Sequence, residues 1–97
     1  MLEQANFDRV RTTSGLTKVD LAALYGVSRQ TIHYWITKGL PREGSFTDRM
    51  AEAITQAILN AVAKGILPLP AMDKTARAAR IASMAKTLQN LKPAPAR

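Results

Sequence analysis

The chain has 97 residues and no cysteine, which suits one small domain and excludes a disulfide framework or a thiolate metal site. Its net charge of +7 is typical of proteins that bind a polyanion such as a nucleic acid. No apolar stretch approaches the roughly 20 residues of a membrane span and no signal-peptide pattern opens the chain, so we expect a cytoplasmic, soluble protein with no membrane partner.

Apolar periodicity and cap residues predict an all-α fold. Residues 3–13 show a first amphipathic pattern, which Ser14-Gly15 ends. The predicted helices after it span residues 18–25, 29–38, 45–64 and 73–91.

The stretch 17–40 carries the strongest local signals. Thr17 and Asp20 have the spacing of a capping box, and Ser28 can cap the next helix. Gly26 lies between the two helices, where the chain must adopt a positive φ that glycine reaches without strain. Two capped helices joined by such a turn predict a helix-turn-helix unit.

The remainder of the chain predicts a hinge, a helix and a tail. Prolines 68 and 70 interrupt any helix, so residues 67–72 are expected to form a packed apolar hinge. On the helix at 73–91, apolar residues recur at spacings of three and four, a seam that suits contact with a second copy more than burial in a monomer core. The predicted dimerisation residues are Ile81, Met84, Leu88 and Leu91. Residues 92–97 are expected to be a disordered tail.

The segment from Lys18 to Trp35 resembles the helix-turn-helix of the Cro and λ-repressor-like (XRE-type) regulators of phages and bacteria. The residues that carry the resemblance are Ala22, Gly26, Val27, Ser28, Ile32 and Trp35. Lys18 departs from the glutamine that is more usual there. The resemblance implies that residues 1–66 form a four-helix λ-repressor-like DNA-binding domain, followed by the C-terminal helix.

The resemblance also implies roles for surface residues. Residues at the start of the recognition helix and one turn later would contact bases, and residues flanking the two helices would contact phosphates. The base-contacting candidates are Ser28, Arg29, Gln30, His33 and Tyr34. The phosphate-contacting candidates are Thr17, Lys18, Thr37, Lys38 and Arg42.

Each role has a plainer alternative. Arg29 can be a solvated charge, and Lys38 can be a favourable cation at a helix C-terminus. Residues 74–97 carry six basic groups and no acid, which suits either phosphate attraction or a solvated helix face. Trp35 is expected in the core, as is Tyr25 with its hydroxyl at the surface. His33 is the only histidine and has no second ligand nearby, so no metal site is predicted.

These patterns predict a function in binding double-stranded DNA, with no enzyme activity, cofactor or small-molecule ligand. We expect a homodimeric regulator, an (auto)repressor of phage or mobile-element type, on a short inverted-repeat operator. Two alternatives stay open: an antitoxin or adaptor-type module that binds a protein through the C-terminal helix, and a phage-type activator that contacts RNA polymerase.

Overall fold

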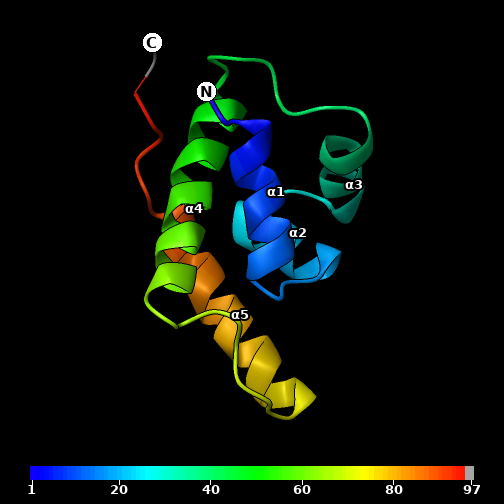
Figure 1. Ribbon diagram of the computed structural model, residues 1–97, viewed down its shortest axis with the longest axis vertical. Helices are drawn as coiled ribbons and strands as arrows, with labels where there is room; N and C mark the ends of the chain where they lie inside the picture. Colours follow the sequence, from blue (N-terminus) through cyan, green and yellow to red (C-terminus); the bar gives the residue numbers. More distant parts are fainter. Residues whose placement is uncertain (96–97) are drawn as a thin grey trace.

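The computed structural model describes residues 1–95, which form five helices and no strand. In Figure 1, α1 and α4 run side by side, α3 lies at the opposite edge from α4, and α5 extends below the other helices. The all-α class is confirmed, and the predicted helix bounds agree to within two residues at each end. The helices are α1 (Gln4–Thr13), α2 (Lys18–Tyr25), α3 (Arg29–Thr37), α4 (Phe46–Ala63) and α5 (Lys74–Gln89).

Side-chain caps begin four of the helices where the sequence predicts them. The Thr17 hydroxyl accepts from the Asp20 N–H at 3.2 Å, and the Asp20 carboxylate accepts from the Thr17 N–H at 2.9 Å, which completes a capping box. The corresponding caps of α3, α4 and α5 are Ser28, Ser45 and Asp73. These bonds satisfy backbone donors that have no partner inside their own helix.

Three aromatic rings form the centre of the core. Phe7 of α1 lies 5.9 Å from both Tyr25 of α2 and Trp35 of α3, and the latter two centroids lie 5.7 Å apart. The ring planes are inclined by 70° to 89°, the edge-to-face geometry that aromatic quadrupoles favour. Trp35 is 4% exposed, which confirms its predicted place in the core. The other buried apolar residues include Leu2, Val10, Leu16, Leu21, Leu24, Ile32, Ile54, Ile58 and Leu67.

The hydroxyl of Tyr25 is buried, so the prediction that it reaches the surface is wrong. It lies 2.5 Å from Oγ1 of Thr55, a residue of α4 that is only 2% exposed. Burial raises the pKa of the Tyr25 phenol well above its ordinary value, although the hydrogen bond with Thr55 opposes the shift. The hydroxyl remains protonated and ties α2 to α4 inside the core.

Helix α5 packs against the rest of the chain, mainly along α2, and completes the same core. Ile81 is 6% exposed and Leu88 is 8% exposed, while Met84 and Leu91 are half-buried against the same cluster. The prediction that this seam is not buried in a monomer core is therefore wrong for Ile81 and Leu88. A seam of two heptads has the same spacing whether its partner helix is in the same chain or in another, and here that partner is α2.

The segments on either side of α5 are also packed. In the predicted hinge, Leu67 is 2% exposed and belongs to the core. Beyond α5, the Ala94 N–H donates to the Arg49 carbonyl at 2.9 Å and Arg49 Nε donates to the Ala94 carbonyl at 3.1 Å. Figure 1 shows this last segment running alongside α4. In the predicted tail, Ala94 is thus held against α4, and residues 96–97 lie outside the described part.

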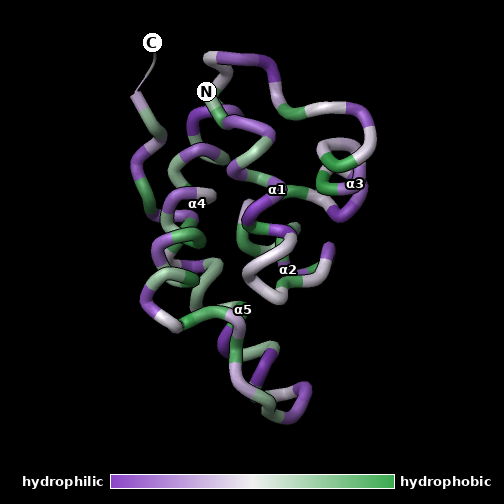
Figure 2. The backbone as a smooth tube through the Cα atoms, viewed as in Figure 1, coloured by the Kyte–Doolittle hydropathy of each residue, from purple (hydrophilic) through white to green (hydrophobic). Residues whose placement is uncertain are grey.

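Figure 2 shows hydrophobic and hydrophilic residues interspersed along the helices. Within residues 1–95 no helix combines the length and apolar character that crossing a membrane requires.

Candidate nucleic-acid interface

Helices α2 and α3 are joined by three residues, Gly26, Val27 and Ser28. Gly26 has φ 68° and ψ 34°, the left-handed conformation predicted for it, and the Val27 N–H donates to the Ala22 carbonyl at 3.0 Å. The turn directs the chain straight from the end of α2 into the Ser28 cap of α3, so the relative placement of the two helices depends on this short connection.

Helix α5 contacts the same turn through Gln89. Its side-chain amide donates to the Leu24 carbonyl at 2.8 Å and approaches the Ala23 carbonyl at 3.4 Å, which satisfies acceptors at the end of α2. A Cβ atom at Gly26 would overlap this amide. The positive φ therefore favours glycine here, and a larger residue would also displace the Gln89 amide from the end of α2.

Helix α3 presents a polar outer face. Its inner face is fixed by Ile32 and Trp35, which are 0% and 4% exposed. Ile32 and Trp35 are three positions apart and therefore share one face of the helix. The residues between them point to the other side, away from the core. All five predicted base-contacting residues are exposed on this outer side: Ser28, Arg29, Gln30, His33 and Tyr34. The Ser28 hydroxyl is already engaged as a cap, since it accepts from the Thr31 N–H at 3.0 Å.

The predicted phosphate-contacting residues lie at both ends of this face. All five are exposed: Thr17, Lys18, Thr37, Lys38 and Arg42. Thr17 and Lys18 open α2 and line a shallow hollow with Arg29, Gln30 and His33 of α3. The last residue of α3 is Thr37, and Lys38 and Arg42 come after it. None of these three residues lines that hollow.

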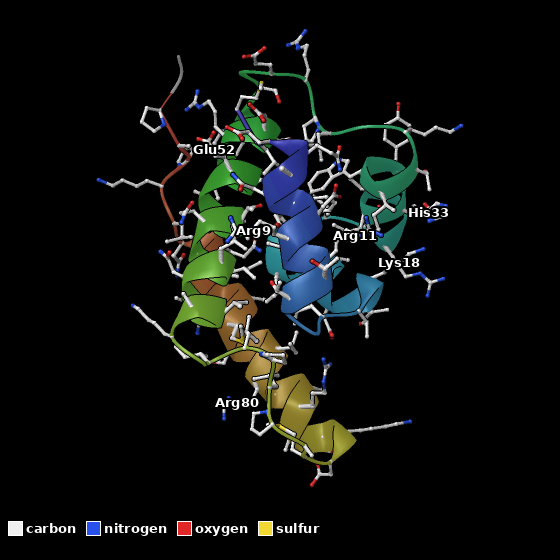
Figure 3. The ribbon with its side chains drawn as sticks, viewed as in Figure 1. Arg9, Arg11, Lys18, His33, Glu52 and Arg80 are labelled. Carbon is white, nitrogen blue, oxygen red and sulfur yellow. The ribbon has the colours of Figure 1, made fainter. Side chains whose placement is uncertain are left out.

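A direct side-chain contact links the two helices in the hollow. Nζ of Lys18 lies 3.0 Å from Nδ1 of His33, and Figure 3 shows the two side chains next to each other at the edge formed by α2 and α3. The predicted base-contacting and phosphate-contacting groups therefore meet at this point.

The electrostatics of the face depend on Asp20, which lies beside the hollow at the start of α2. Residues 21–42 contain three basic groups and no acid, so Asp20 is the nearest carboxylate within the α2–α3 segment. Arg77 of α5 binds it through two hydrogen bonds, of 2.9 Å and 2.8 Å. Burial alone would raise the pKa of Asp20, but the hydrogen bonds from Arg77 and Thr17 outweigh burial and the pKa lies below its ordinary value of 3.8. Arg77 thus neutralises this negative charge.

Arg77 and Gln89 were not predicted as contributors to this site. Both come from α5 and contact α2 from 57 and 65 residues along the chain. No local pattern indicates which α5 side chain meets α2. The sequence did offer one indication. A carboxylate at the start of a helix, in an otherwise basic segment, requires a cationic partner if it is buried.

The predicted site contains no ligand set for a metal. Nowhere in residues 1–95 do three or more histidine or acidic side chains gather as a metal ion would require. Comparisons of the chain with protein-family models, with curated proteins and with solved structures find no match.

Proposed function

We propose that this chain is a sequence-specific double-stranded DNA-binding regulator, a repressor of phage or mobile-element type, in which α2, the turn and α3 act as a helix-turn-helix. The observation that carries the proposal is the outer face of α3. It exposes a row of hydrogen-bonding side chains and adjoins Lys18, and the acid at the start of α2, Asp20, is paired with Arg77. Major-groove recognition needs such a helix, with donors and acceptors that reach base edges.

Selection from a random duplex library at near-physiological salt tests this proposal directly. Enrichment of an inverted repeat with a fixed centre spacing is the expected result, because a twofold dimer reads two half-sites about 34 Å apart. Retention of no preferred sequence, together with binding that vanishes as salt rises, would leave only a basic chain on a polyanion and overturn the proposal.

Arg29 separates base reading from simple charge. Its guanidinium can donate two hydrogen bonds to a guanine, so Arg29→Ala should cost roughly 1–3 kcal/mol on the preferred sequence and relax the preference at one base pair. Competition binding against the selected operator and its single-base variants measures both effects. Lys38→Ala is the matched control, since loss of a phosphate contact should weaken all sequences alike. Equal losses on operator and random DNA for both variants would contradict the role of Arg29.

A homodimer on DNA requires an interface that leaves both α3 helices facing the duplex. The remaining accessible part of the α5 seam lines a groove beside α4. Figure 1 shows α3 at the opposite edge of the molecule from α4. A twofold contact there would direct the two α3 helices away from a common duplex. The loop 38–45 joins α3 to α4 across one end of the molecule (Figure 1), and Phe46, the first residue of α4, is 66% exposed. We therefore assign the dimer contact to this end, with Phe46 as its apolar centre.

Phe46→Ser should convert the dimer to a monomer without unfolding the domain, because the ring is outside the core. We expect roughly tenfold weaker binding to the inverted repeat and unchanged binding to an isolated half-site, since a central aromatic anchor is a typical hot spot. Sedimentation and half-site titration measure the two effects. Met84→Ser is the control from the α5 seam and should leave binding cooperativity intact. If Met84→Ser abolishes the dimer and Phe46→Ser does not, the interface lies on α5 instead.

One observation favours a second function, that of a protein-binding module. An apolar groove lies between α4 and α5, lined in part by Ala57, Ile66 and Met84, and Ile66 at its edge is 47% exposed. Such a groove can accept an apolar side chain of another protein. This reading becomes the better one if library selection retains no DNA sequence.

A further inference from the structure

The contact between Lys18 and His33 determines how the imidazole can hydrogen-bond. Lys18 opens α2 and His33 lies on the outer face of α3, and their side chains meet with Nζ 3.0 Å from Nδ1 (Figure 3). Both residues are exposed, so the pair stands at the surface of the proposed DNA face.

An ammonium group has three donors and no acceptor, whereas each nitrogen of a neutral imidazole is either a donor or an acceptor. Nδ1 of His33 must therefore accept from Lys18, and the ring hydrogen must be on Nε2. The other charged group lining this hollow is Arg29, which also has donors only. None of the residues that line this hollow is an acid, and Asp20 is held by Arg77; Asp8 of α1 lines the adjoining hollow, on the other side of Lys18 with Arg11.

We propose that Lys18 is a positioning residue for base recognition, which holds His33 as the neutral Nε2–H tautomer so that the imidazole presents a single donor to the major groove. This inference rests on the proposed function. In the major groove guanine, adenine and thymine each present an acceptor, whereas cytosine presents only its N4 amino donor. A fixed Nε2–H donor therefore selects against cytosine at the base that His33 contacts.

The residue type at position 18 matters for this selection. A glutamine amide both donates and accepts, so it would allow either imidazole tautomer, and a methionine would hold neither. Lysine is the side chain that forces Nδ1 to accept. At the same time its two remaining donors stay available for a phosphate, so Lys18 links backbone positioning to base reading.

Library selection with Lys18→Met tests the inference, with Lys38→Met as matched control. The wild-type protein should exclude cytosine at one position by about tenfold, the loss expected for one mismatched contact. Both variants should lose affinity on all sequences and lower the salt slope by about one phosphate contact. Lys18→Met alone should admit cytosine, because the freed imidazole can present Nε2 as an acceptor to N4.

Two further measurements make the result decisive. His33→Glu should prefer cytosine at the same position, since a carboxylate accepts from N4. Nitrogen NMR at pH 8 on the free protein reports the tautomer directly, and the single histidine makes the signals unambiguous. Hydrogen on Nε2 in the wild type, with a larger Nδ1–H share in Lys18→Met, supports the inference.

Hydrogen on Nδ1 in the wild type would overturn it. So would an unchanged base preference in Lys18→Met while the wild type still selects an operator. Failure of the wild type to select any sequence is a different outcome, since it removes the proposed function on which the inference rests.

Discussion

Trp35→Ala is expected to destabilise the domain by about 3–5 kcal/mol, the usual range for truncating a buried tryptophan. Trp35 is 4% exposed and meets both Phe7 and Tyr25 edge-to-face, so truncation removes two ring contacts and leaves a cavity between α1, α2 and α3. A domain of this size has a total stability of roughly 5–15 kcal/mol, so most of it would be lost. Chemical denaturation followed by circular dichroism measures the change.

The neighbouring residue provides the control. Tyr34 is 60% exposed on the outer face of α3, and Tyr34→Ala should change the free energy of unfolding by less than about 0.5 kcal/mol. The effects on DNA affinity should be the opposite of the effects on stability. Tyr34→Ala should weaken DNA binding, whereas Trp35→Phe, which keeps the fold, should leave the affinity unchanged. A stable Trp35→Ala variant that has lost only DNA binding would instead indicate a stacking role for Trp35.

The local features of the fold could be predicted from the sequence because their physical causes are local. The capping box of Thr17 and Asp20, the cap at Ser28 and the left-handed Gly26 each depend on residues within a few positions, and each is present. The exposed outer face of α3 follows in the same way, since Ile32 and Trp35 fix which side of the helix is buried.

The relations between distant elements could not be predicted in this way. The spacing of Ile81 and Leu88 indicates that α5 has an apolar side, but not whether that side meets α2 or a second copy. The hydrogen bond of Tyr25 to Thr55 joins residues 30 positions apart, and no pattern pairs them. Each of these contacts depends on where α4 and α5 pack, which is decided by the whole core.

Helix α5 holds α2 at both ends, a consequence of these distant contacts. Gln89 satisfies carbonyl groups at the end of α2, and Arg77 binds Asp20 at its beginning. Since α2 carries Lys18 and adjoins α3, the position of the proposed DNA face depends on α5 even though α5 supplies none of the predicted contact residues. We infer that α5 is a structural part of the proposed DNA-binding unit.

Asp20→Ala should destabilise the domain by about 2–4 kcal/mol. The substitution removes a capping bond, which is worth about 1 kcal/mol, and leaves Arg77 without the carboxylate that receives both of its hydrogen bonds. Asp20 is 6% exposed, but the Arg77 side chain is 33% exposed and can turn to water, so the loss should stay below that of a fully buried ion pair. Asp8→Ala is the control, because Asp8 forms exposed contacts only, a pair with Arg11 at 3.5 Å and a hydrogen bond from Gln4 at 3.0 Å.

The contribution of the Asp20 charge can be separated by pH. Asparagine keeps the shape of the cap, so the difference in unfolding free energy between wild type and Asp20→Asn reports the charged pair with Arg77. Because the folded state lowers the pKa of Asp20 below 3.8, this difference should be constant from pH 7 to above that value. It should then shrink as the pH falls through the lower pKa of the folded state, where the carboxylate protonates. A difference that grows on acidification would mean that burial outweighs Arg77 and that the pKa of Asp20 is raised.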